Sequence, residues 1–566
     1  MCSRFFSNQS KSKSSNRCLA LRSGRLSPLL AAALLAAWVL PSLAADQTVA
    51  PDRDVQWGEL PAAVSRADVL EAIEAMRPID PALVSKVTEI PATPILNFLH
   101  FRLIMTLSDE PALTIDQLLR VGEVDRALKV ADRLPPKSAK PPGLVIAIAE
   151  ASLARGRDDA ACSDIKRLVQ DRSPLSPEQD IRALQLTVLC AVLTKDKTAA
   201  KSGSALLTER KAGTPAILAA LSMLADGNTP EPWKPFPLGV VDARILALAG
   251  IEPNGAALAV ATPSGLSAIV ATSEFSSEAR VTAAETAARQ GHFHPVLLAA
   301  AYSKAEADPS GLANPLATSL DGAAKRALLF QAIRAEGDDS KRAILIRALV
   351  EDARSDGLAA AVSATVTEEI LRTPLHRSNA WFAATAAEGL SCDGKYSDAA
   401  EWAIIGAAAV RPEKGSELLG WLLLNNIGDP NGDADRVSAM KLAEDLQTAG
   451  LLSDPLLHRL VTVLDALAYD TPVLLREAAA KAPQPTGGRL PPTGLLRDLK
   501  AKSRANAVPE SLSLVLQAFG AERADAVNLM TLGDAIQALR AVGFEKEARR
   551  LGFEALLPDW PRQAGG

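Results

Sequence analysis

The chain has 566 residues, of which 48% are hydrophobic and only 4% aromatic, and its formal net charge at pH 7 is −5. An acidic chain of this kind argues against nucleic acid or an anionic lipid surface as its partner. Long runs of alanine and leucine, with few alternating strand patterns, predict an all-α protein.

Residues 1–44 are predicted to be a signal peptide. Six basic and no acidic residues precede an apolar run from Leu29 to Leu40, and small residues allow cleavage after Ala44. The apolar run has 12 residues, fewer than the ~20 that span a bilayer. We therefore expect export to a bacterial periplasm, with anchoring in the inner membrane as the alternative. Cleavage would change the net charge from −5 to −11.

The rest of the chain divides at stretches rich in proline and glycine. Four prolines within residues 229–237 exclude a helix there, and the composition of residues 482–494 predicts a second break. For residues 240–275 we expect short helices. The predicted segments are a linker (45–66), N-terminal helical repeats (67–228), a Pro-rich connector (229–239), further helical repeats (240–481), a Pro/Gly linker (482–494) and a terminal helical unit (495–557).

Three cysteines follow the predicted leader. Cys162 lies near the start of one predicted helix, and Cys190 lies near the end of the next. In an antiparallel pair these two ends are neighbours, and an exported protein meets an oxidising environment. The sequence predicts a Cys162–Cys190 disulfide, with two buried free thiols as the alternative. Cys392 is expected to remain unpaired.

Residues 379–412 read as two short helices joined by a tight turn. Gly394 suits the left-handed position that ends a helix, and Pro412 stops the second helix. Trp381, Gly394, Tyr396 and Pro412 stand where a tetratricopeptide repeat (TPR) has its aromatic residue, its G-x-Y turn and its final proline. The stretch resembles that repeat, although its first helix is about two residues longer. Glycine turns at residues 122, 156, 337 and 543 repeat the pattern without a fixed period.

As a whole, the chain is similar to uncharacterised secreted Ala-rich helical-repeat proteins of bacteria. The leader, the cysteine spacing and the run at residues 276–291 carry this resemblance. The two resemblances imply an α-solenoid of antiparallel helix pairs, TPR-like, behind a flexible export segment. They imply no activity.

One loop has oxygen-bearing side chains at alternate positions, as at the start of a calcium loop: Asp429, Asn431, Asp433 and Asp435. However, the sixth position is Ala434, where glycine is expected, and the twelfth is Met440, where a glutamate is expected. A helix-capping loop is the favoured interpretation, and calcium binding the alternative.

Two other patterns are weaker. S-x-x-K occurs at residues 163–166 and 438–441, but without the companion motifs of serine–lysine enzymes. His292 and His294 lie two residues apart with no further metal ligand nearby. G-x-S-x-G, H-E-x-x-H, C-x-x-C and phosphate-binding-loop motifs do not occur in the sequence. We therefore expect no enzyme, no cofactor and no metal.

The expected function is that of a periplasmic module that binds a protein or peptide partner of the cell envelope. Trp381, Trp402 and Trp421 are candidates for the partner surface, although large aromatic residues on helices are more often part of a core. The alternative is a structural or assembly scaffold of the cell envelope. A murein hydrolase is a distant alternative, because the terminal unit is too short for a catalytic domain.

Overall fold

A computed structural model describes residues 79–107, 110–134, 140–171, 174–227, 233–292, 294–410 and 412–562. They all belong to one compact unit, residues 55–566. The predicted signal peptide and the linker 45–66 lie outside the described residues. The described part of the chain contains 29 α-helices and four short 3-10 helices and no strand, which confirms the all-α prediction. None of these helices is both long and apolar enough to cross a membrane.

The first third of the described chain contains nine helices. Several begin with proline at the first helical position, where the missing N–H costs nothing. At α8, Ser176 and Gln179 form a reciprocal capping box, with both hydrogen bonds 3.2 Å long. The bounds are α2 (Pro81–Ser85), α3 (Pro94–Met105), α4 (Pro111–Arg120), α5 (Val124–Asp132), α6 (Pro142–Leu153), α7 (Asp158–Gln170), α8 (Pro177–Leu193), α9 (Lys197–Glu209) and α10 (Pro215–Asp226).

The middle third contains several short helices, as predicted for residues 240–275. Gly265 in α13 packs so closely against the backbone of Leu238 that a Cβ atom at this position would lie 2.1 Å from the Leu238 carbonyl oxygen. The bounds are α11 (Val240–Leu248), α12 (Gly255–Ala259), α13 (Pro263–Ala271), α14 (Ser277–Arg289), α15 (Pro295–Ser303), α16 (Pro309–Ala313), η1 (Pro315–Ala317), α17 (Gly322–Ala335), α18 (Asp339–Ser355), α19 (Ala359–Thr365) and α20 (Thr367–Leu371).

The last third begins with the predicted hairpin and ends with a 3-10 turn. Residues 482–494 contain no helix, and four α-helices follow them. The bounds are η2 (Arg377–Phe382), α21 (Ala383–Cys392), α22 (Tyr396–Ala409), α23 (Pro412–Gly428), η3 (Gly432–Asp435), α24 (Arg436–Thr448), α25 (Asp454–Ala466), α26 (Val473–Lys481), α27 (Leu495–Arg504), α28 (Val508–Phe519), α29 (Leu529–Ala541), α30 (Glu545–Leu556) and η4 (Leu557–Asp559).

The predicted hairpin is formed by α21 and α22, which pack on each other. Gly394 has the expected left-handed conformation, with φ +74°. The helices approach closely because Gly406 faces Ala383, where a Cβ on Gly406 would lie 2.5 Å from the Cβ of Ala383. One detail differs from the prediction: the residues up to Phe382 form 3-10 helix η2, and the α-helix begins only at Ala383.

The other predicted glycine turns agree with the structure in three of four cases. Gly122, Gly156 and Gly543 all have positive φ. Gly337 does not, because the chain leaves α17 through Glu336 in an extended conformation. A glycine in a sequence therefore locates the end of a helix better than it predicts the conformation of that end.

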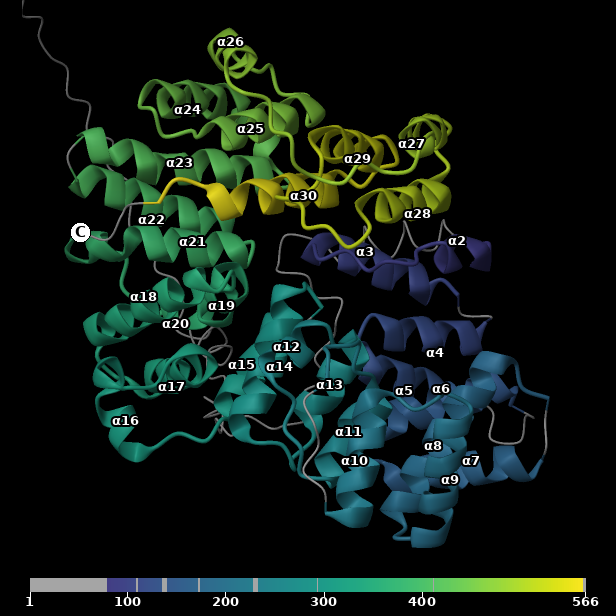
Figure 1. Cartoon of the computed structure of the whole chain (residues 1–566). Coiled ribbons are helices and arrows are strands. Elements are labelled where there is room, and N and C mark those ends of the chain that lie inside the picture. The colour runs from purple at the N-terminus through teal and green to yellow at the C-terminus, as the bar shows by residue number, and fades with distance from the viewer. Residues whose placement is uncertain are drawn as a thin grey trace, which may run out of the picture. The chain divides into compact units, whose positions relative to one another are not determined.

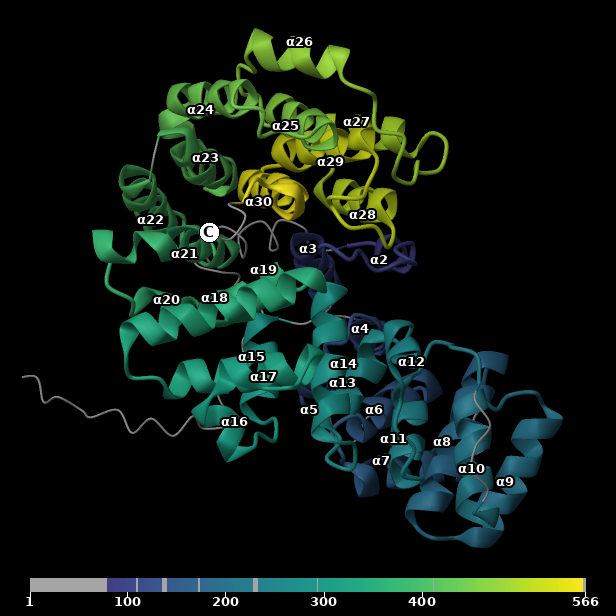
Figure 2. The same ribbon diagram turned by 60° about the vertical axis from the view of Figure 1, so that its left-hand side comes forward.

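Packing joins consecutive helices and also joins the two ends of the described chain. Helix α3 contacts α28 and α30, and Figures 1 and 2 both show α3 beside α28. Helices α23 and α25 also contact α30. The four helices after residue 494 therefore share a hydrophobic core with the first helices, rather than packing only on one another.

One disulfide and one buried ion pair also link helices to each other. Cys162 in α7 and Cys190 in α8, the predicted pair, form a disulfide, whereas Cys392 is free and buried. The guanidinium group of Arg326 in α17 is buried and donates to both carboxylate oxygens of Glu285 in α14, at 2.6 and 2.7 Å. The hydroxyl of Tyr302 in α15 donates to the same carboxylate at 2.8 Å. Three helices thus meet at one buried ion pair.

Candidate functional site

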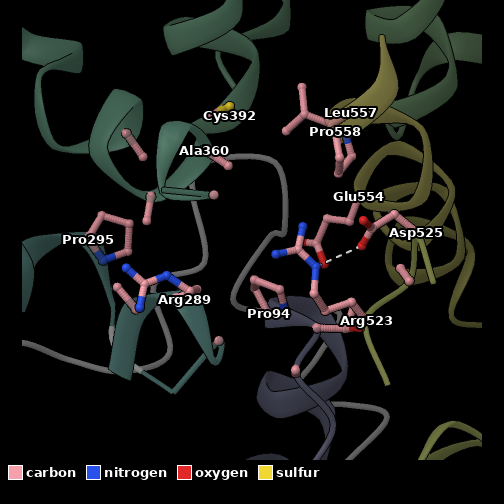
Figure 3. A pocket seen from close by; sticks show the side chains of 18 of the residues that line it. Pro94, Arg289, Pro295, Ala360, Cys392, Arg523, Asp525, Glu554, Leu557 and Pro558 are labelled. Atoms are coloured by element: carbon pink, nitrogen blue, oxygen red, sulfur yellow. Dashed lines mark hydrogen bonds and ion pairs between the residues drawn. The ribbon is translucent and has the colours of Figure 1, made fainter. Parts of the chain in front are cut away.

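A cavity of about 180 Å³ opens where segments from both ends of the chain meet. Its walls come from α3, α14, α15, α19, α21, α30 and the loop between α28 and α29. Figure 3 shows Pro94 of α3 between Arg289 and Pro295 on one side and Arg523, Asp525 and Glu554 on the other. The site therefore exists only while α3 stays docked against α30.

Hydrogen bonds from α3 hold that docked position. The backbone N–H of Ile95 donates to a carboxylate oxygen of Glu554 at 3.1 Å, so a side chain of α30 satisfies one of the free N–H groups at the start of α3. The hydroxyl of Thr93 donates to the Glu522 carbonyl at 3.3 Å. The side-chain amide of Asn97 donates to the Gly291 carbonyl at 2.8 Å.

Arg550 also lines the cavity, and each of its three guanidinium nitrogens donates a hydrogen bond. Its Nε donates to Glu554 at 3.0 Å, and its terminal nitrogens reach the Cys392 carbonyl at 2.8 Å and the Tyr396 hydroxyl at 3.2 Å. Burial raises the pKa of Glu554, while Arg550 and the Ile95 N–H favour its charged form. Arg550 is thus a structural cation that ties α30 to α21.

Arg523 is different, because its donors are only partly used. Its Nε donates to Asp525 at 2.8 Å, and Figure 3 shows its guanidinium group extending toward the middle of the cavity. Its two terminal nitrogens have no hydrogen-bond partner among the described residues. The side chain is 39% exposed, so the cavity reaches solvent at this point.

Arg289 lines the opposite side of the cavity. Its Nε donates to the carbonyl of Asp356 at 2.9 Å, and its terminal nitrogens likewise have no partner in the described part of the chain. Small residues also line the cavity, among them Ala288, Ala360 and Ala361. The cavity therefore combines a mostly small, apolar wall with unused N–H donors.

Two further ionisable groups line the cavity. Burial raises the pKa of Cys392 to about 12, so its thiol stays protonated at neutral pH and is a poor nucleophile. Burial also raises the pKa of Asp393 to about 6, against the opposing influence of Lys395 and Arg550. This arrangement is suited to binding a ligand through hydrogen bonds and shape.

Comparisons with known proteins do not identify the chain. No protein-family model, curated protein or solved structure matches it. Function must therefore be argued from the residues themselves.

The structure corrects the predicted tryptophan surface at two of its three positions. Trp402 is 3% exposed and Trp421 is 1% exposed, so both belong to the core. The ring of Trp402 packs edge-on against Phe382 at a centroid distance of 5.7 Å. Burial explains the correction, because an indole that fills the gap between packed helices cannot also contact a partner. Trp381 is 43% exposed and remains a candidate.

The candidate calcium loop contains the 3-10 turn η3. A carboxylate oxygen of Asp429 accepts the backbone N–H of Asn431 at 2.8 Å, which is the behaviour of a capping residue. Asp435 is exposed directly before α24, and the side chain of Asp433 lies outside the described residues. Among the residues that are described, no group of three or more His, Cys, Asp or Glu side chains could hold a metal ion. Calcium binding stays an untested hypothesis.

The remaining patterns occupy ordinary structural positions. Ser163, Lys166, Ser438 and Lys441 are exposed, so neither lysine is desolvated as a serine–lysine pair requires. The imidazole of His294 caps α15 by accepting the Val296 N–H at 3.2 Å.

His292 is half-buried, and the desolvation of its ring lowers its pKa to about 4; its Nδ1 lies 3.3 Å from the side-chain amide of Asn97. The charged residues of the cavity were missed by sequence reasoning. Arg550 and Glu554 lie in α30, where six of the twelve residues are charged, so nothing in the sequence sets them apart.

Proposed function

We propose that this chain is an exported, TPR-like α-solenoid that binds a protein or peptide partner of the cell envelope and catalyses no reaction. The observation that carries the proposal is the cavity between α3 and α30, where Arg523 offers unused N–H donors beside a small apolar wall. Hydrogen-bond donors converging on an apolar pocket are typical of binding sites.

Two further features support export and a repeat architecture. The Cys162–Cys190 disulfide suits an oxidising compartment such as the periplasm. Consecutive helices pack on one another through much of the chain, and left-handed glycines end several of them, as in stacked helical repeats. Intact-mass measurement of protein from the periplasmic fraction tests the compartment: we expect a chain that begins after Ala44 and is lighter by the two hydrogen atoms removed when the disulfide forms. A reduced, full-length chain in the cytoplasm would contradict export.

Site-specific photo-crosslinking tests the binding function. A photoreactive amino acid at Ala360, an exposed residue of the cavity wall, is compared with the same probe at Val437. Val437 is highly exposed on α24, away from the cavity lining. In the cells that produce the protein, we expect a discrete adduct from position 360 that is lost on Arg523→Gln and is absent from position 437. Equal adducts from both positions, or none from position 360, would refute the proposal.

One observation favours the scaffold as a second candidate. Trp381 in η2 and Ile404 in α22 are both more than two-fifths exposed, and their elements contact each other. Exposed apolar residues of neighbouring elements are a feature of assembly surfaces. If the chain is a scaffold, Trp381→Ala will release it from large envelope assemblies, while adducts at position 360 will not form.

A further inference from the structure

The cavity offers more hydrogen-bond donors than acceptors. Two of its three carboxylates already accept hydrogen bonds: Asp525 from Arg523, and Glu554 from Arg550 and Ile95. The terminal nitrogens of Arg289 and Arg523, in contrast, have no partner within the described chain. A ligand that satisfies these groups must therefore bring acceptors, not donors.

The charge of the walls limits how negative such a ligand can be. Three arginines (289, 523 and 550) face three carboxyl groups (Asp393, Asp525 and Glu554) around the cavity. The lining is close to electrically balanced, so a dianion such as a phosphate monoester would meet repulsion from the carboxylates. A single negative charge can pair with the free side of one guanidinium group, and a carboxylate matches the planar fork of arginine.

The size and composition of the walls define the rest of the ligand. The volume of about 180 Å³ is below the 300–1,000 Å³ of typical drug-sized sites. Ala288, Ala360, Ala361 and Ala364 leave room for small apolar groups and supply no polar side chain. Arg523 and Arg289 are both accessible to solvent, so a ligand can enter from outside with its charged end near the mouth.

We propose that the cavity binds a carboxylate carried on a small apolar group, and that the terminal nitrogens of Arg523 donate to that carboxylate. This inference rests on the proposed binding function and narrows its ligand. Two sources share the chemistry: a free short-chain carboxylic acid, and the C-terminus of a polypeptide that ends in small residues. In the second case the cavity captures the end of the partner chain.

Calorimetric titration of the purified full chain tests this inference with four probes: N-acetyl-alanyl-alanine, its C-terminal amide, butyrate and inorganic phosphate. We expect the peptide acid to bind and the amide to bind at least about 10-fold more weakly, because a hydrogen bond to a charged group is lost. If butyrate binds as tightly as the peptide, the natural ligand is a free short-chain carboxylic acid. If the peptide binds about 10-fold more tightly than butyrate, the natural ligand is the C-terminus of a polypeptide.

Matched variants assign the contact to Arg523. Arg523→Gln should weaken binding of the peptide acid at least about 10-fold, while Arg497→Gln, at an exposed arginine of α27, should leave it unchanged. Circular dichroism and thermal melting of both variants check that the fold is retained. N-acetyl-alanyl-tryptophan should bind more weakly than the alanine peptide, because an indole is much larger than a methyl group and the cavity has a volume of only about 180 Å³.

Several results would overturn the inference. They are equal binding of the acid and its amide, tighter binding of phosphate than of the peptide, or unchanged affinity in a folded Arg523→Gln protein. The crosslinking experiment above separates this failure from that of the proposed function. If position 360 forms its adduct while no carboxylate probe binds, the binding function stands and the ligand class proposed here is wrong.

Discussion

Reduction of the Cys162–Cys190 disulfide should loosen α7 and α8 by a calculable amount. The two cysteines are 28 residues apart, and in the chain-entropy model closing a loop of that length removes about 12 cal/mol/K from the unfolded segment. At 25 °C this corresponds to about 3.6 kcal/mol, or about a 400-fold change in the equilibrium for local opening. The effect should stay local, because α7 packs mainly on its neighbours α6 and α8.

Hydrogen exchange measured by mass spectrometry gives the assay. Amides of α7 and α8 should exchange up to about 400-fold faster in reduced protein and in the C162S/C190S double variant than in oxidised protein. Amides of α25 serve as the internal control and should not change. The double variant should be insensitive to reductant. A change below about 5-fold in α7 and α8, or an equal change in α25, would refute the loop-closure reasoning.

Three further predictions concern stability, measured by urea denaturation. Gly265→Ala should destabilise by about 1–3 kcal/mol, because its new Cβ meets a backbone carbonyl, whereas Gly255→Ala, with no atom within 4 Å, should change stability by less than about 0.5 kcal/mol. Arg326→Leu should lower the free energy of unfolding by about 3–5 kcal/mol, because it leaves the buried carboxylate of Glu285 without its ion-pair partner. Arg347→Leu, which breaks an exposed ion pair, should lower it by less than about 1 kcal/mol. Burial raises the pKa of Glu123 from 4.5 to about 8, so the folded state holds a proton that the unfolded state releases, and stability should fall as pH rises from about 4.5 to 8. Glu123→Gln should remove that part of the pH dependence, and an unchanged slope would contradict it.

The local features of this fold could be predicted because they depend on nearby residues. The turn at Gly394 follows from its break in a helical pattern, and the Cys162–Cys190 pair follows from two adjacent helices. The all-α class follows from the long runs of alanine and leucine and the scarcity of alternating strand patterns. In each case the decisive contact joins elements that are neighbours in the sequence.

The candidate site could not be predicted for the opposite reason. Ile95 and Glu554 are 459 residues apart, and no periodicity in the sequence indicates that the first and last helices meet. The error over Trp402 has a related cause, because sequence alone does not show which face of a helix a neighbour covers. Its burial depends on the packing of η2 on α22, where Phe382 meets the indole.

The contact between α3 and α30 also orders events during synthesis. Helix α3 is apolar on nearly every side, and nine of its twelve residues are buried. The N–H of Ile95 finds its acceptor on Glu554, which is synthesised 459 residues later. Until α30 has been made, part of the apolar surface of α3 has no partner. Packing of α3 into the core therefore waits for α30, so this part of the molecule completes its folding only after α30 has been synthesised.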